Sequence, residues 1–418
     1  IKINKTKTAT VLCALIMGAS AIAPSFGFAV GTETQSSQST ETEAGKKSDG
    51  SDSSAEKEQP KTDSQGRPIL GSGETGILIE SSTGQVLFES DSSKRMYPAS
   101  TTKVMTALIA VEAVAAGEVS MDEQIEITPQ MLEGLDPDGS NMALKEGEII
   151  SFENLLKGLM IPSGNDAALA IAYRLSQSPD AFAQRMNDRA QQLGLNDTHF
   201  ANPHGLHDEN HYTTAADMAK IAREAMKHDT FRNIVDIAHV KIPPTNKTEK
   251  ERYYINTNGL LSTMRYRDYY YKNSIGIKTG RTKEAGNCLV SAAKRNGMEL
   301  IGVLFGGKDV SDSHKDSIRM LDYGFNNFGS IRAVSKDKIL GEIKVKRGRS
   351  KDSVTLSAAA ETYVVVPKDV SADQLEFRLN TPDALYAPLK KGQTVSDASI
   401  IYQGQEIGTV QLCVDADI

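Results

Sequence analysis

Apolar residues recur at helical spacing through the middle of the chain, whereas strand-like runs flank that region on both sides. Ile77-Leu78-Ile79-Glu80 and Gln85-Val86-Leu87-Phe88-Glu89 enclose the turn Ser81-Ser82-Thr83-Gly84 and predict a β-hairpin. The next segment predicts a cluster of helices. We place them at residues 98–114, 152–159, 165–175, 182–193 and 214–226.

Strand patterns return after Tyr269. Residues 274–279, 288–293 and 300–305 predict strands, and the last two are joined by Arg295-Asn296-Gly297, a strong hairpin signal. An amphipathic helix is expected at residues 313–323. Because strands come early and late with helices between them, we expect an α+β domain over residues 69–332. It would hold an antiparallel sheet whose outer strands come from both ends of the domain, packed against a helical cluster.

The pattern changes again near the C-terminus, where short β-like runs are separated by Gly, Pro and Asn or Asp turns. These runs lie at residues 343–345, 353–356, 363–366, 375–379 and 408–412. They predict a small β-sandwich domain over residues 338–418. It carries no recognisable catalytic constellation.

The first 68 residues differ from both domains. Lys2, Lys5 and Lys7 precede an apolar run at residues 9–23, and Gly27-Phe28-Ala29 is a cleavage-like site. Residues 1–29 therefore predict a secretory signal peptide, with an N-terminal membrane anchor as the alternative. Residues 30–68 are almost free of apolar side chains and predict a disordered linker. Either reading of the N-terminus exports the rest of the chain.

Composition narrows the function classes. The 418 residues carry a formal net charge of -7 and no Trp, which argues against nucleic-acid binding. Cys288 and Cys413 leave one disulfide open but no disulfide framework. No metal-ligand motif is present, and we expect no metal or cofactor. A polar loop is the favoured interpretation of the histidine cluster, whose members are His199, His204, His207 and His211.

A nucleophile–base pair is the first chemical signal. In Ser100-Thr101-Thr102-Lys103, the Ser and Lys lie three residues apart at a helix start and therefore share one face. A Ser hydroxyl needs a neighbouring base to become nucleophilic. Lys can be that base only when burial or nearby positive charge lowers its pKa. Taken alone, this spacing is common and usually belongs to an exposed helix surface.

Two further motifs supply the missing parts. Ser163-Gly164-Asn165 opens a helix; its hydroxyl can relay a proton to a leaving amine, and its amide can bind a peptide carbonyl. Lys278-Thr279-Gly280 ends a strand. There Lys278 supplies the charge that lowers the Lys103 pKa, and Gly280 lets a substrate backbone lie close to the strand. Each motif is common by itself, but their joint order and settings argue against chance.

Together the motifs resemble the S-x-x-K, S-x-N and K-T-G set of penicillin-binding proteins and serine β-lactamases. Tyr97-Pro98-Ala99 before Ser100, Asp166-Ala167-Ala168 after Asn165, and Asn202-Pro203-His204-Gly205-Leu206 make the likeness closer to low-molecular-mass D-alanyl-D-alanine carboxypeptidases. The likeness covers about residues 69–325, and the β-rich tail is similar to that family's C-terminal domain. It implies the fold of penicillin-binding transpeptidases for the first domain.

The resemblance implies an exported enzyme that removes the terminal D-alanine from peptidoglycan pentapeptide stems and is inhibited by β-lactams. Ser100 would form the acyl-enzyme, with Lys103 as base and Ser163 as proton relay. Thr279 would bind the substrate carboxylate, and backbone N–H groups of Ser100 and Arg281 would hold the oxyanion. Asn165, Lys278 and Gly280 complete the expected substrate-binding set.

Two departures from the family pattern stand out. Many relatives carry a carboxylate-binding Arg where this chain has Ser313, and Arg281, His314 or Lys315 could substitute for it. Relatives also usually end in an amphipathic or hydrophobic anchor, whereas this sequence stops at Ile418, directly after a predicted strand. We expect either a longer natural chain with an anchor at the membrane surface or a released protein. The alternatives are a β-lactamase or DD-endopeptidase on the same fold, or a non-catalytic wall-peptide binding protein. We find no clear equivalent of the deacylating Glu of class A β-lactamases.

Overall fold

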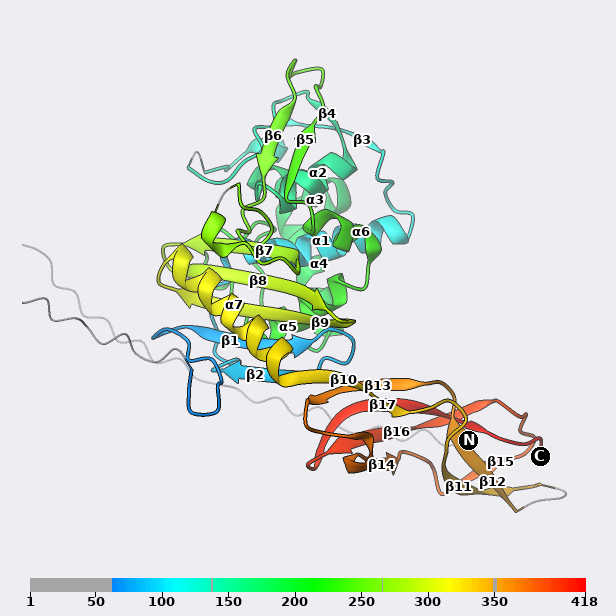
Figure 1. Cartoon of the computed structure of the whole chain (residues 1–418). Helices are drawn as coiled ribbons and strands as arrows, with labels where there is room; N and C mark the ends of the chain where they lie inside the picture. The colour runs from blue at the N-terminus through cyan, green and yellow to red at the C-terminus, as the bar shows by residue number, and fades with distance from the viewer. Residues whose placement is uncertain (1–61, 137, 265, 349–351) are drawn as a thin grey trace, which may run out of the picture. The chain divides into compact units, whose positions relative to one another are not determined.

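A computed structural model of the chain describes residues 62–136, 138–264, 266–348 and 352–418 (Figure 1). The predicted signal peptide and the linker up to residue 61 lie outside the described residues. Residues 62–68, which the prediction also assigns to the linker, form a turn in which the Asp63 carboxylate accepts hydrogen bonds from the backbone N–H groups of Gln65 and Arg67. Within the described ranges, no helix is long and apolar enough to cross a membrane.

The first domain is built on a five-stranded antiparallel sheet with the order β2-β1-β9-β8-β7. Its strands are β1 Thr75–Glu80, β2 Val86–Ser90, β7 Ser274–Thr282, β8 Gly286–Arg295 and β9 Met298–Gly307. Strand β1 pairs with β9 over Thr75–Glu80, which brings the two ends of the domain together. The predicted hairpins are confirmed, and so is a sheet that combines early and late strands. Strand β7 lies at one edge of this sheet.

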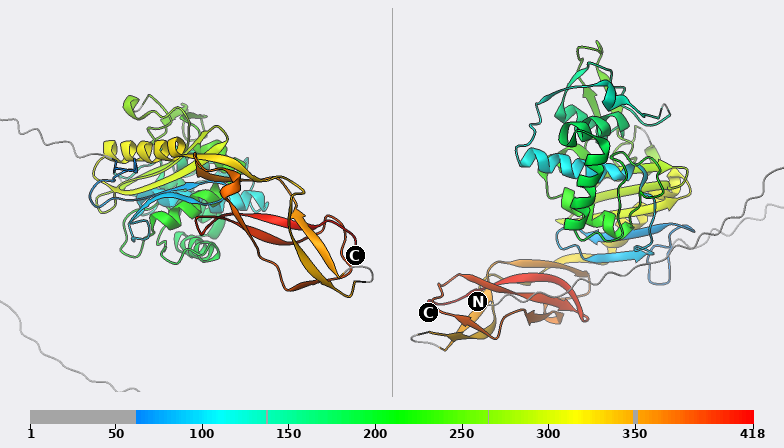
Figure 2. Two further views of the ribbon diagram at one scale, coloured as in Figure 1. Left: turned by 60° about the horizontal axis from the view of Figure 1, so that its bottom comes forward. Right: turned by 180° about the vertical axis from the view of Figure 1, so that it is seen from behind.

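Helices cover both faces of this sheet (Figures 1 and 2). The cluster on one face comprises α1 Lys103–Ala115, α2 Phe152–Met160, α3 Asn165–Ser176, α4 Pro179–Gln192, α5 Ala215–Ala225 and α6 Asp229–Val235. The other face is covered by α7 Val310–Asn327. The predicted helices are confirmed, but α6 and two small hairpins were not predicted. Those hairpins are β3 Gln124–Glu126 with β4 Ile149–Ser151 and β5 His239–Ile242 with β6 Arg252–Ile255.

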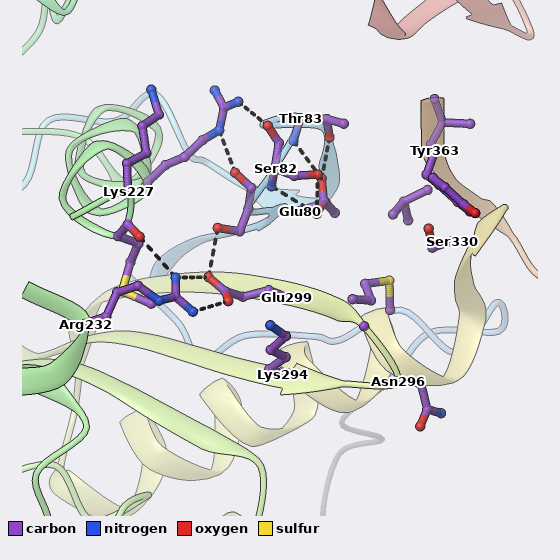
Figure 3. Close-up of a pocket in the computed structure, with 17 residues that line it drawn as sticks. Glu80, Ser82, Thr83, Lys227, Arg232, Lys294, Asn296, Glu299, Ser330 and Tyr363 are labelled. Atoms are coloured by element: carbon purple, nitrogen blue, oxygen red, sulfur yellow. Dashed lines mark hydrogen bonds and ion pairs between the residues drawn. The ribbon is translucent and has the colours of Figure 1, made fainter. Parts of the chain in front are cut away.

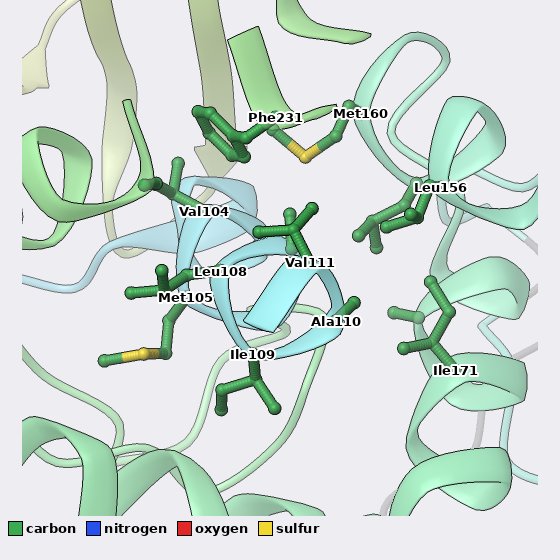
Figure 4. Packing of buried hydrophobic residues seen from close by; sticks show 14 of the residues in the cluster. Val104, Met105, Leu108, Ile109, Ala110, Val111, Leu156, Met160, Ile171 and Phe231 are labelled. Atoms are coloured by element: carbon green, nitrogen blue, oxygen red, sulfur yellow. The ribbon is translucent and has the colours of Figure 1, made fainter. Parts of the chain in front are cut away.

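Helix α1 runs through the centre of the cluster, as Figure 4 shows. Val104, Ile109 and Ala110 point to different sides of the helix and are all nearly inaccessible to solvent. A helix that is apolar all round must be buried on every side, and here the surrounding helices and the sheet bury it. The helix that carries the candidate base is therefore held rigidly in the domain core.

The second domain is rich in β-strands, as predicted. It contains a two-stranded sheet of β10 Phe328–Val334 and β13 Thr362–Pro367. Its six-stranded sheet has the order β14-β16-β17-β12-β11-β15. Those strands are β11 Ile339–Lys346, β12 Ser353–Ala358, β14 Glu376–Leu379, β15 Ala384–Tyr386, β16 Thr394–Tyr402 and β17 Gln405–Val414. Both sheets share one apolar core. Because β10 pairs with β13, this domain begins at Phe328, before the predicted residue 338.

Candidate active site

Ser100 lies in a 3-10 turn, Ala99–Thr102, that leads directly into α1. We call these four residues the Ser100 turn. Ala99 has a positive φ of 48°, which bends the chain sharply just before the serine. The Ser100 side chain is half-buried and its Oγ accepts a hydrogen bond of 3.0 Å from Lys103 Nζ. The predicted helix start thus brings the two side chains together.

The Lys103 amine is wholly buried, with an exposed fraction of 0%. Besides Ser100, it donates to Asn165 Oδ1 at 2.8 Å and to the backbone oxygen of His204 at 2.7 Å. Burial is the main reason why the pKa of Lys103 lies well below its usual range, and repulsion from Lys278 lowers it further. Asp166 acts in the opposite direction. In its neutral form the amine has only two N–H groups. These donate to Asn165 and His204, and the lone pair then faces the Ser100 hydroxyl.

Ser163 lines the same cavity as Ser100. It has a positive φ of 69° and is only 3% exposed. Its Oγ has no hydrogen-bond partner among the described residues, although buried hydroxyls are normally satisfied. Two residues later Asn165 begins α3, and its amide oxygen reaches Lys103. A buried hydroxyl without a partner beside Ser100 is placed to bond to a substrate atom.

Asp166 is a positioning residue whose role was not predicted. Its buried carboxylate accepts hydrogen bonds from the backbone N–H groups of Met142 at 2.9 Å and Leu144 at 3.0 Å. Burial raises the pKa of Asp166, and these hydrogen bonds oppose that rise. The carboxylate thereby ties the segment that contains Ser140, at the cavity wall, to the start of α3. The position of Asp166 directly after Ser163-Gly164-Asn165 does not reveal this role, because the sequence does not show that the segment at Met142 and Leu144 lies beside it.

The third motif lies on β7, at the edge of the sheet. Lys278 is buried, and Thr279 Oγ1 donates to Thr257 Oγ1 at 2.6 Å. Gly280 has a packing role that was not predicted. A Cβ at Gly280 would lie 2.9 Å from Pro98 O and 3.0 Å from Ser100 N. The glycine is therefore required because the Ser100 turn packs directly against the strand.

One cavity collects most of these groups. Its volume is about 240 Å³, and Ser100, Ser163, Thr279, Gly280 and Arg281 all line it. Lys103, Asn165 and Lys278 are buried next to these residues. All the predicted site residues therefore gather in one region, although they come from segments that are far apart in the sequence.

The histidine cluster does not converge on one point. His204 contributes its backbone oxygen to Lys103, and its ring is buried with a pKa lowered to about 3 by desolvation. The His211 ring lies against Thr102 Oγ1 at 2.7 Å, and desolvation lowers its pKa to about 4. Both rings are neutral groups within the protein interior. The role of the His204 carbonyl was not predicted, because every residue has a backbone oxygen and the residue type does not indicate which one is used.

A second cavity, of about 840 Å³, lies elsewhere on the sheet (Figure 3). Glu299 pairs with Arg232 at 2.6 Å, and Glu80 accepts hydrogen bonds from Ser82 and Thr83. Both carboxylates are thus already bonded within the protein, and among the described residues that line this cavity no hydrogen bond joins a lysine to a hydroxyl. The smaller cavity at Ser100 is the candidate active site.

Comparison with known proteins gives a consistent result. A profile of the family described as D-alanyl-D-alanine carboxypeptidase matches residues 63–309, and one described as penicillin-binding protein 5, C-terminal domain, matches residues 328–418. D-alanyl-D-alanine carboxypeptidase DacF of Bacillus subtilis is 31% identical over 82% of this chain and 82% of its own length. DacA of Haemophilus influenzae is 32% identical over 82% of this chain and 85% of its own length.

Comparison with solved structures points to the same family. Penicillin-binding protein 5 of Haemophilus influenzae superposes with a TM-score of 0.69 and 31% identity, over 82% of this chain and 96% of that protein. A mutant of the Streptomyces K15 DD-transpeptidase superposes with a TM-score of 0.57 and 32% identity. That match covers 62% of this chain and 100% of the Streptomyces chain.

Proposed function

This chain belongs to the D-alanyl-D-alanine carboxypeptidase family and is a serine D-Ala-D-Ala carboxypeptidase, and we propose that Ser100 is its nucleophile and Lys103 the base that activates it. The observation that carries this assignment is the buried Lys103 amine, 3.0 Å from Ser100 Oγ and lowered in pKa. Because burial and Lys278 both disfavour its charged form, Lys103 is suited to accept the Ser100 proton.

Acylation begins when Ser100 Oγ attacks the carbonyl carbon between the two terminal D-alanines and passes its proton to Lys103 Nζ. Backbone N–H groups of Ser100 and Arg281 hold the oxygen that becomes negative. The C–N bond then breaks, and the departing amine takes a proton through the Ser163 hydroxyl, which has no partner among the described residues. Lys103 supplies that proton, so the base returns to its neutral form.

Deacylation repeats these steps with water. A water molecule gives a proton to Lys103 and attacks the ester carbonyl, and Ser100 leaves with that proton. Asn165 and the β7 edge at Thr279 and Gly280 hold the peptide during both steps, and Lys278 keeps the Lys103 pKa low. The edge position of β7 supports this role, because an edge strand can pair with an extended peptide.

The family acts on peptidoglycan peptides and binds β-lactams, and its fold is present here. We extend this to pentapeptide stems as the substrate and to action outside the cytoplasmic membrane. DD-endopeptidase and transpeptidase reactions share the acyl-enzyme. Incubation with a D-Ala-D-Ala pentapeptide, with products identified by mass, separates them, since a carboxypeptidase releases free D-alanine and a tetrapeptide.

The nucleophile is tested by covalent labelling with a fluorescent penicillin. The intact protein should be labelled, and Ser100→Ala should abolish the label because no other activated hydroxyl is assigned. Ser140→Ala is the matched control, and this variant should still be labelled. Ser140 lines the same cavity but has no role in the proposed steps. A labelled Ser100→Ala protein would contradict the assignment.

A further inference from the structure

The wall that α7 contributes to the active-site cavity carries no positive charge. Ser313 and His314 line the cavity. The Ser313 hydroxyl donates to the backbone oxygen of Val310 at 3.0 Å. Lys315 is exposed and does not line the cavity.

His314 is fixed in its neutral form. Its Nε2 accepts a hydrogen bond from the backbone N–H of Gly259 at 3.1 Å, so the ring proton is on Nδ1. That Nδ1–H donates to the backbone oxygen of Val310 at 2.8 Å. Burial also lowers the pKa of His314. A second ring proton would point at the Gly259 N–H, so this histidine does not provide a cation.

Strand β7 brings a cation to the same cavity. Alternate residues of a strand point to the same face, so Thr279 and Arg281 share one face while Gly280 between them faces the Ser100 turn. The β7–β8 register is regular from Gly276 to Thr282, which keeps this alternation intact. Thr279 and Arg281 both line the cavity, no acidic residue is among its lining residues, and the Arg281 side chain is exposed.

We propose that the Arg281 guanidinium binds the terminal carboxylate of the substrate, next to the Thr279 hydroxyl. The substrate ends in a carboxylate that must enter this cavity for Ser100 to reach the preceding amide. A guanidinium presents a planar pair of N–H donors that matches a carboxylate, and it is always protonated. Arg281 is the lining residue with a permanent positive charge. The inference rests on the proposed function, because it names the residue that binds the terminal carboxylate of the proposed substrate. The reaction leaves that carboxylate unchanged.

The test compares two forms of one peptide that ends in D-Ala-D-Ala, with a free carboxylate or with a C-terminal carboxamide. Arg281→Leu should lower kcat/KM for the free carboxylate by about tenfold to a hundredfold, as expected for a lost charged hydrogen bond. It should change kcat/KM for the carboxamide little. Arg281→Lys, which keeps the charge but loses the planar pair of donors, should fall between. Lys283→Leu is the matched control, since Lys283 is exposed nearby but does not line the cavity, and it should not alter either value.

A binding measurement separates this inference from the proposed function. In a Ser100→Ala background the peptide cannot acylate the protein, and calorimetry gives its Kd directly. Arg281→Leu in that background should raise the Kd of the carboxylate peptide by a similar factor and leave that of the carboxamide unchanged. Equal effects on both peptides, or none on either, would overturn the role of Arg281 even if Ser100 is the nucleophile. If D-alanine is not released by the intact protein, this difference in Kd still decides the inference.

Discussion

The chemistry depends most on Lys103, because its surroundings decide which proton form it takes. Two acceptors fix its orientation, Asn165 Oδ1 and the His204 backbone oxygen, and they come from two separate segments of the chain. Burial removes the water that would stabilise an ammonium ion, and Lys278 adds like-charge repulsion. The same side chain on a helix surface would be a cation and could not accept the Ser100 proton.

The contribution of Lys278 can be tested by pH dependence. Lys278→Met removes a positive neighbour, so protonated Lys103 becomes less unfavourable and its pKa rises. The acidic limb of the pH profile for acylation by penicillin should therefore move to higher pH, because more base is needed to obtain the neutral amine. Stopped-flow or gel-based acylation rates across pH 5–9 measure this shift.

The control for this experiment is Lys272→Met, which removes an exposed lysine just before β7. Its acidic limb should stay where it is in the unmodified protein. A Lys278→Met profile that loses amplitude without moving would show that Lys278 serves only to bind the substrate.

At the scale of elements, the Ser100 turn and the loop before α5 form one packed unit. Lys103 donates to the His204 oxygen and Thr106 Oγ1 to the Pro203 oxygen. Gly205 has a φ of +89°, and a Cβ there would lie only 1.9 Å from the Ala99 oxygen. The added Cβ is fixed to the backbone of the loop and the oxygen is a backbone atom, so this contact cannot be relieved by rotating a side chain. The loop thus supplies an acceptor to the base and fixes the turn that presents the nucleophile.

Gly205→Ala should therefore disrupt both stability and acylation. We expect the free energy of unfolding to fall by about 3 kcal/mol or more, because left-handed strain adds to a backbone clash. Chemical denaturation measures the stability, and penicillin labelling measures the activity. Gly194→Ala is the matched control: its φ is +69°, and nothing lies within 4 Å of the added Cβ. It should cost only about 1 kcal/mol and leave labelling intact. Similar losses in the two variants would contradict the role of the Ala99 contact.

At the scale of the whole molecule, the catalytic and β-rich domains have largely separate cores. The main core of the first domain is formed by residues between Ile77 and Phe305, and that of the second by residues between Ala333 and Val414. All the residues assigned to catalysis or substrate binding precede Phe328. We therefore expect the first domain to carry out the reaction without a residue from the second.

A chain that ends at Asn327 tests this separation. It should fold and be acylated by penicillin at a rate close to that of the full chain, because no site residue and no residue of the main first-domain core is removed. Circular dichroism checks folding, and the acylation rate checks the site. A truncated protein that folds but is acylated far more slowly would show that the β-rich domain supports the site.

Local features of the sequence were enough to predict the helices, most of the strands and the α+β class. The spacing of Ser100 and Lys103 on one helical turn is likewise a local property, and so is the alternation of Thr279 and Arg281 along a strand. Helix α6 and the small hairpins were not predicted, because short elements bury few residues and leave weak periodicity. Each of them depends on packing against the larger elements.

By itself, the sequence determined the order of the elements and the residue types that carry the chemistry, because periodicity and motif spacing depend on near neighbours. Only the tertiary structure decided which groups meet. It brought the His204 oxygen to Lys103, tied Asp166 to the segment at Ser140 and placed Gly280 against the Ser100 turn. It also made His314 neutral through a contact with Gly259. These contacts join segments that are distant in the chain, and backbone atoms form several of them, so no residue pattern records them.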